Sequence, residues 1–108
     1  MVIEINQENF EKEVAKSKIP VIIDFFADWC GPCQMMKPVF EKLSESYKGR
    51  LKFSKINTEN DPELATKFSV QGIPCLIITK NGKEVNRIVG FMQEDSLKEK
   101  INGILNNI

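Results

Sequence analysis

The most informative segment of this chain is Trp29-Cys30-Gly31-Pro32-Cys33, which follows the apolar run from Val21 to Ala27. The β-branched and aromatic residues of this run are typical of a central strand that is buried on both faces. Pro32 suits the first turn of a helix. The two thiols are therefore predicted where a strand ends and a helix begins. Cysteines at this spacing can close and reopen an intramolecular disulfide, which is the chemistry of a dithiol–disulfide oxidoreductase.

The two cysteines are expected to differ in character. Cys30 is predicted at the N-terminus of the helix, where the partial positive charge favours a thiolate by about 0.3–1 kcal/mol. Cys33 lies one turn into the helix and is predicted to be the less exposed, resolving thiol. The same spacing also occurs in inert cysteine pairs and in half of a shared metal site. The flanking Trp and the intervening Gly-Pro favour the redox interpretation.

Length and composition limit the alternatives. The 108 residues are predicted to form a single domain over residues 1–108. The 15 basic and 15 acidic side chains cancel, which argues against nucleic acid or an anionic membrane as a partner. The chain has no histidine, and this excludes Cys-His nucleophile pairs and His-ligated metals. Three cysteines are one short of a four-thiolate zinc site, so no metal site is predicted.

The N-terminal segment bears on location. Glu4 and Glu8 stand where a secretion signal requires basic residues and then an apolar run. The run Val21 to Ala27 is interrupted by Asp24 and is too short to span a bilayer. We therefore expect a cytoplasmic protein without a membrane segment.

The remaining pattern alternates strands and helices. Strands are predicted at residues 2–5, 21–27, 51–57, 75–79 and 84–89, with a tight hairpin turn at Asn81-Gly82. Helices are predicted after an Asn6 cap, from 32 or 33 to about 47, from an Asp61 cap and Pro62 to about 68, and from about 94 to 105. This order predicts an α/β fold in which a mixed sheet has helices for both faces.

The segment from Phe25 to Cys33 strongly resembles the active-site segment of the thioredoxin family. The likeness covers essentially the whole chain through landmarks in the family's order and spacing: Asp24, Pro38, Lys55-Ile56-Asn57, Gly72-Ile73-Pro74, Asn81-Gly82 and Val89-Gly90. The resemblance implies the thioredoxin fold, a central mixed five-stranded sheet flanked by four helices. It also implies a general protein disulfide reductase without a bound cofactor, because the electrons travel in the cysteines. The implied partners are disulfide-containing client proteins and a flavin- or ferredoxin-linked thioredoxin reductase, and we expect a monomer.

The resemblance also assigns catalytic roles. Cys30 would attack the client disulfide, and Cys33 would resolve the mixed disulfide. Asp24 would lie beneath the dithiol and relay a proton for Cys33, with Lys55 modulating it. Burial in an apolar run should raise the pKa of Asp24. The residues alone leave open an exposed strand aspartate, an aspartate capped by local backbone groups and, for Lys55, a solvated strand lysine.

A client-docking surface follows from the same match. The Gly-Ile-Pro segment implies that the bond before Pro74 is cis and that the backbone of Ile73 pairs with an extended client peptide. The predicted docking residues are Trp29, Gly31, Pro32, Gly72, Ile73, Pro74, Gly90 and Phe91.

Four positions depart from the usual pattern of the family. Phe26 stands where a second Trp is common, Gln34 replaces a basic residue, and Phe91 is bulkier than the usual residue. Cys75 stands where Thr is usual and is predicted near the dithiol. It is either a small packed residue or a third redox thiol that forms an alternative disulfide or a regulatory adduct.

The sequence leaves rival functions open. An oxidant or isomerase of the same fold would use the same cysteines at a higher reduction potential, although Gly-Pro between them resembles the reducing members. A non-catalytic subunit would clamp a partner with the docking surface. A dimer bridged by metal through two C-x-x-C pairs is a third alternative.

Overall fold

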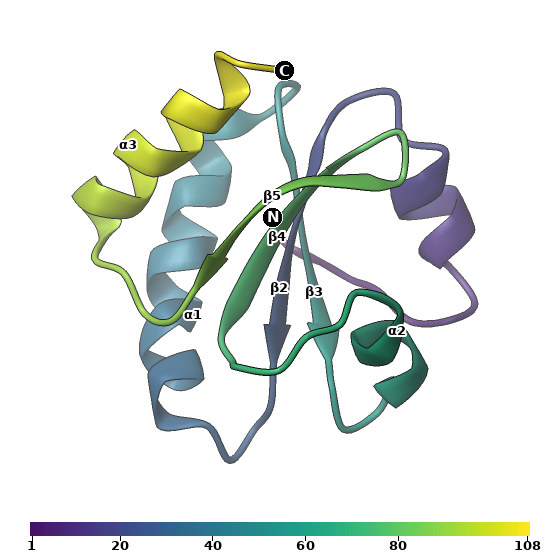
Figure 1. Cartoon of the computed structure of the whole chain (residues 1–108). Coiled ribbons are helices and arrows are strands. Elements are labelled where there is room, and N and C mark those ends of the chain that lie inside the picture. Colours follow the sequence, from purple (N-terminus) through teal and green to yellow (C-terminus); the bar gives the residue numbers. More distant parts are fainter.

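The computed structural model describes residues 1–108 as one alternation of strands and helices (Figure 1). The elements are β1 (Ile3–Glu4), a π-helical segment η1 (Glu11–Ala15), β2 (Val21–Phe26), α1 (Gly31–Ser44), a 3-10 turn η2 (Glu45–Tyr47), β3 (Lys52–Asn57), α2 (Pro62–Lys67), β4 (Cys75–Lys80), β5 (Lys83–Val89) and α3 (Glu94–Leu105). This order confirms the predicted α/β fold. None of the helices combines the length and apolar character that crossing a membrane requires.

The five strands form one mixed sheet in the order β1-β3-β2-β4-β5. Strand β3 runs parallel to β1 and β2, whereas β4 is antiparallel to both β2 and β5. The apolar run therefore forms the central strand, as predicted from its composition. The register places Asp24 beside Lys55 on β3 and beside Leu76 on β4.

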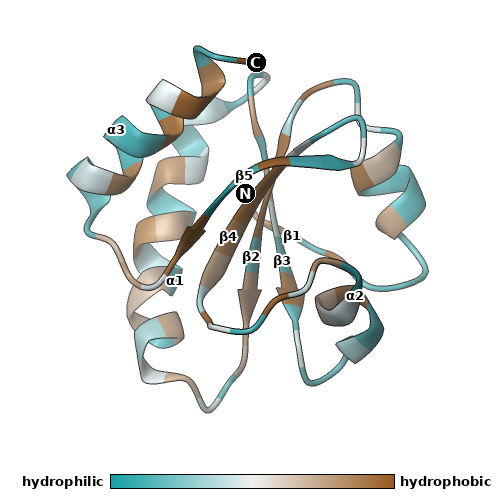
Figure 2. Ribbon diagram, viewed as in Figure 1, coloured by the Kyte–Doolittle hydropathy of each residue, from teal (hydrophilic) through white to brown (hydrophobic).

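Helices cover both faces of this sheet. Figure 1 shows α1 and α3 on one face, and η1 with α2 on the other. Successive side chains of a strand point to opposite faces, so Ile22 and Ile78 join the core beneath α1 and α3. Ile23 and Ile77 join the second core, beneath η1 and α2. Figure 2 shows that apolar residues gather along these central strands. Because they point to both faces, the sheet has a separate core on each side.

Local sequence chemistry accounts for the C-terminal third of the chain. Asn81 and Gly82 have left-handed φ angles of 55° and 79°, the backbone that a two-residue hairpin turn requires. Helix α3 has the predicted bounds, although Leu105 at its end is only half-buried. The hairpin makes β5 an edge strand of the sheet.

Asp61 is the N-cap residue of α2, as predicted, but the capping hydrogen bond expected of its side chain is absent. Its Oδ1 instead accepts a hydrogen bond from the backbone N–H of Gln7 at 3.3 Å. The backbone N–H of Gln7, which the tertiary fold brings close, therefore donates to this carboxylate in place of an N–H group of the helix. Pro62 does occupy the predicted first position of the helix.

The first helical segment is also different in type. Asn6 Oδ1 accepts hydrogen bonds from the N–H groups of Glu8 and Asn9, as a cap does. The residues that follow form π-helical turns, in which the Lys16 N–H donates to the carbonyl of Glu11. The cap was predicted correctly, but apolar spacing alone does not distinguish a π-turn from an α-helix.

Candidate active site

The two cysteines of the C-x-x-C segment lie at the N-terminus of α1, where the loop that leaves β2 ends. Figure 1 shows this junction. Cys30 is the N-cap residue of α1, and Cys33 lies in its first turn. Their Cα atoms are 5.2 Å apart, and their sulfur atoms are joined in a disulfide. Pro32 is accommodated here because the first turn of a helix has N–H groups without a partner in any case.

The helix terminus distinguishes the two sulfur atoms. The backbone N–H of Cys33 donates a hydrogen bond to Cys30 Sγ at 3.2 Å. This donor and the helix dipole both favour negative charge on Cys30. Exposure does not distinguish them, because Cys30 is 4% exposed and Cys33 is 3% exposed. The predicted difference in exposure is therefore absent from the disulfide form.

Asp24 is the only carboxylate residue buried in the protein, at 5% exposure. Its Oδ1 has no hydrogen-bond partner. Burial raises the pKa of Asp24 to about 7, although the positive charge of Lys55 lowers it in part. The exposed-aspartate alternative is thus wrong, and the carboxyl group can both accept and release a proton near neutral pH.

A small cavity of about 70 Å³ brings Asp24 and Cys33 together. Such a volume is large enough to admit water. Lys55 also lines the cavity, and its Nζ lies 5.9 Å from the centre of the Phe26 ring. The cavity is also lined by Gln34 and by three exposed polar residues that were not singled out from the sequence: Asp28, Lys37 and Glu41.

The segment before β4 lies against the disulfide. The bond between Ile73 and Pro74 is cis, as the family match implies. The carbonyl oxygen of Ile73 lies 3.9 Å from Cys30 Sγ, and Ile73 packs against the small cluster of Ala27, Cys30 and Cys33. The N–H of Ile73 donates no hydrogen bond within the protein, so its backbone is free to pair with an added strand.

Exposed apolar side chains belong to the same end of the molecule. Trp29 is 71% exposed and Phe91 is 37% exposed. The sequence interpretation missed two further exposed apolar residues, Met35 and Val89. A Cβ on Gly72 would lie 3.4 Å from Val89 Cγ1, so Val89 extends the predicted docking surface directly. The sequence did offer one indication that Val89 is exposed, because it is the last residue of a strand at the edge of the sheet.

Cys75 is a free thiol with 1% exposure. It lies opposite Phe25 of β2 and Val89 of β5, and it packs in the core beneath η1 and α2. The dithiol belongs to a different cluster. Burial raises the pKa of the Cys75 thiol, and the Arg87 guanidinium lowers it in part. This packing favours the small packed residue over a third redox thiol, whose role stays a prediction.

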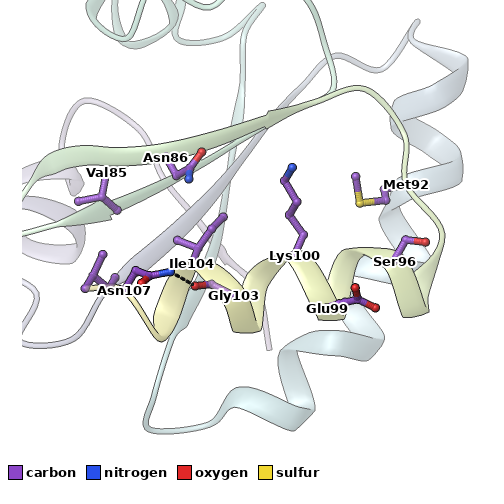
Figure 3. Close-up of a pocket in the computed structure, with 10 residues that line it drawn as sticks. Val85, Asn86, Met92, Ser96, Glu99, Lys100, Gly103, Ile104 and Asn107 are labelled. Atoms are coloured by element: carbon purple, nitrogen blue, oxygen red, sulfur yellow. Dashed lines mark hydrogen bonds between the residues drawn. The ribbon is translucent and has the colours of Figure 1, made fainter.

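The largest hollow of the molecule lies elsewhere. It has a volume of about 640 Å³ and lies between β5 and α3, where Val85, Asn86 and the α3 side chains line it (Figure 3). None of its lining residues is a cysteine. No group of three or more Cys, Asp and Glu side chains gathers at metal-binding distance. The thiol chemistry is therefore concentrated at the small cavity beneath the disulfide.

Comparisons with known proteins agree with this geometry. The family model described as Thioredoxin matches residues 1–103. The chain is 39% identical to the thioredoxin of Rickettsia bellii over 108 residues, which cover both chains completely. It is 36% identical to thioredoxin 1 of a Nostoc species, over 91% of this chain and 92% of that one. It is also 36% identical to the thioredoxin of Porphyra purpurea, over 94% of each chain. With a redox-capable cysteine pair in the matched region, the chain belongs to the thioredoxin family and is a thiol–disulfide oxidoreductase.

Proposed function

We propose that this protein is a general reductase of protein disulfides that works in the cytoplasm and is itself reduced by a thioredoxin reductase. The observation that carries the proposal is the unpartnered carboxyl group of Asp24, which shares one small cavity with Cys33. A pKa of about 7 suits this group to take a proton from the resolving thiol at neutral pH. A merely structural disulfide has no need of such a group.

In the first step, the Cys30 thiolate attacks one sulfur of a client disulfide. A bond forms between Cys30 Sγ and that sulfur, and the client's own S–S bond breaks. The second client sulfur leaves as a thiolate and takes a proton from solvent. The N–H of Cys33 and the α1 dipole stabilise the attacking thiolate before the step.

In the second step, Cys33 gives its proton through the cavity to the Asp24 carboxylate. The resulting thiolate attacks Cys30 Sγ, and the bond between Cys30 and the client breaks. The client sulfur leaves as a thiolate and is protonated. Two electrons have then passed to the client, and the protein holds the Cys30–Cys33 disulfide. Thiol exchange with the dithiol of a reductase returns it to the reduced form.

Client docking is supported by the backbone of Ile73, which lies beside Cys30 Sγ and has an unpaired N–H. An extended peptide can add to such a backbone as a further strand. The exposed Trp29, Val89 and Phe91 supply apolar surface for the flanking client residues. The client is thus held by its backbone and is read only loosely by its side chains, as a general reductase requires.

A reductase-coupled assay with a disulfide-bonded protein such as insulin tests this proposal. We expect turnover with an NADPH-linked or a ferredoxin-linked thioredoxin reductase. The Cys33→Ser variant should accumulate clients as mixed disulfides on Cys30, whereas Cys30→Ser should trap none. The absence of turnover with every reductase, together with the absence of trapped clients, would contradict the proposal.

The direction of electron flow needs a separate measurement. Equilibration with glutathione buffers should give a reduction potential clearly below that of the glutathione pool, because a reductant must give electrons up. A potential in the range of the secretory oxidants would identify an oxidase instead. Full biological function in a Cys30→Ser, Cys33→Ser double variant would favour a non-catalytic clamp.

A further inference from the structure

Strand β5 and the glycine that follows it hold both ends of the segment that faces the dithiol, residues 69–74, which is called the docking loop below. At one end, the N–H of Gly90 donates to the carbonyl of Pro74 at 2.8 Å. At the other end, Arg87 Nη2 donates to the carbonyl of Phe68 at 2.7 Å. The edge strand and the residue at its C-terminal end therefore anchor the loop on both sides.

The middle of the docking loop has few anchors of its own. The N–H of Val70 donates to the carbonyl of Ala65 at 2.9 Å, which ties the start of the loop to α2. The N–H groups of Gln71, Gly72 and Ile73 donate no hydrogen bond within the protein. Apart from the packing of the Ile73 side chain, the position of this stretch therefore depends on the contacts at its two ends.

Arg87 is itself held in a fixed orientation. Its Nε and Nη2 atoms donate to the two carboxylate oxygens of Glu84, each at 2.6 Å. A guanidinium that forks onto a carboxylate in this way keeps one geometry. Nη2 can then direct its remaining hydrogen at the carbonyl of Phe68.

A bulge in β5 makes this pair of side chains meet. Thr79 pairs with Glu84 and Ile78 pairs with Asn86, so Val85 is an extra residue in the ladder. Residues three apart in a regular strand point to opposite faces. The bulge shifts the alternation by one residue and re-aims Glu84 and Arg87 to the same side.

We propose that Arg87, oriented by Glu84, is a positioning residue that fixes the docking loop against the dithiol and so determines how tightly extended protein clients bind. It acts through the carbonyl of Phe68 and touches neither the client nor the reacting sulfurs. The inference rests on the proposed reduction of client proteins. Neither the C-x-x-C segment nor the other family landmarks include Arg87.

The physical reason is pre-organisation. A client that pairs with the backbone of Ile73 must find the docking loop in one conformation. If only a fraction of molecules has that conformation, the apparent dissociation constant rises by the inverse of the fraction. A small aromatic disulfide needs no strand pairing, so its reduction should not depend on the anchor.

The first experiment compares Arg87→Ala with Lys83→Ala in steady-state reduction of a protein client. Lys83 is an exposed cation on the same strand and makes no ion pair, so it controls for lost charge. In Arg87→Ala we expect KM for the client to rise about 3–10-fold while kcat stays within about twofold. The client KM of Arg87→Lys should lie between those of Lys83→Ala and Arg87→Ala, because an ammonium group cannot fork onto Glu84 and reach Phe68 as well.

Reduction of a small aromatic disulfide is the internal control and should be the same in all of these proteins. An unchanged client KM in Arg87→Ala would overturn the proposal. An equal rise in Lys83→Ala would also overturn it, because lost charge would then be the cause.

The second experiment reads the loop directly by amide hydrogen exchange. The N–H groups of Val70 and Gly90 are hydrogen-bonded at the two ends of the docking loop. In Arg87→Ala they should exchange about 3–10-fold faster, while amides of β2 keep their protection. Unchanged exchange at the loop, or equally faster exchange in β2, would contradict a positioning role. This measurement holds even if the wild-type protein reduces no client, an outcome that would defeat the proposed function alone.

Discussion

Asp24 and Cys75 lie on neighbouring strands, one register position apart, and both are buried acids with raised pKa values. Desolvation is the main cause in each case. Their surroundings differ, however. Asp24 lines a cavity that also contains Cys33, whereas Cys75 packs among apolar residues of the core beneath η1 and α2. Burial alone shifts a pKa, but only a group with a partner and a path for protons can take part in catalysis.

The pleat of the sheet produces this difference. Phe25 pairs with Cys75, and both residues join the core beneath η1 and α2. Asp24 is one residue earlier and therefore points to the opposite face, where α1 carries Cys33. Two ionisable groups that are close along the sheet are thus separated by the sheet itself.

The largest expected effect is on turnover, and it distinguishes the loss of Cys30 from the loss of Cys75. Cys30→Ser should lower reductase-coupled turnover at least about a thousandfold, because the nucleophile is lost. Cys75→Ser, the matched change on the other face, should leave turnover within about twofold. Comparable losses in the two variants would show that the two faces are coupled and would break the comparison.

The next effect is on stability, and its sign follows from linkage. The pKa of Asp24 is about 7 in the folded protein and 3.8 ordinarily, so the folded state binds this proton more tightly than the unfolded state. The contribution is fully present below pH 3.8 and is lost as the pH rises to about 7. At 1.36 kcal/mol per pH unit, the loss is on the order of 4 kcal/mol.

Urea unfolding of Asp24→Asn measures this loss. The variant should be more stable than the wild type at pH 8 by up to about 4 kcal/mol, and the difference should vanish near pH 4. A constant difference between the two proteins across this range would mean that Asp24 does not titrate as described.

Part of the contrast between Asp24 and Cys75 could be predicted from the sequence. The apolar run predicted the central strand, and Asn81-Gly82 predicted the hairpin turn, because both signals are local. The family resemblance, rather than any residue pattern, supplied the cis bond at Pro74 and the closeness of Asp24 to the dithiol. The expectation that Cys75 lies near the dithiol came from its place after Pro74. The alternation of β4 places its side chain in the core beneath η1 and α2, and its role as a redox thiol stays a prediction.

Longer-range contacts escaped the sequence analysis altogether. Gln7 competes for the Asp61 carboxylate from 54 residues away, and no local pattern reveals that donor. The meeting of Glu84 with Arg87 depends on the bulge at Val85. A one-residue shift in strand alternation leaves no mark that propensity or periodicity can detect.

A smaller effect concerns the influence of Lys55 on the Asp24 carboxyl group. Lys55 lowers the pKa of Asp24, so Lys55→Gln should raise the pH midpoint of the resolving step by roughly one unit or less. Stopped-flow measurement of Cys33 attack on a preformed mixed disulfide gives this midpoint. Lys37→Gln is the matched control, because Lys37 lines the same cavity but does not contribute to the pKa of Asp24. Equal shifts in both variants would mean that the overall charge of the cavity mouth, rather than Lys55, sets the midpoint.

The smallest effect concerns Cys75 itself. Because the thiol is buried in the core beneath η1 and α2 and its pKa is raised, it should resist alkylation in the folded, reduced protein while Cys30 reacts. Cys75→Ala should lower the free energy of unfolding by on the order of 1 kcal/mol, as is usual for a small core truncation, without changing turnover.

Mass mapping of the wild-type protein after mild oxidation should find only the Cys30–Cys33 disulfide. A linkage between Cys75 and Cys30, or an adduct on Cys75 formed without unfolding, would show that the sheet opens far enough for the two faces to exchange thiols.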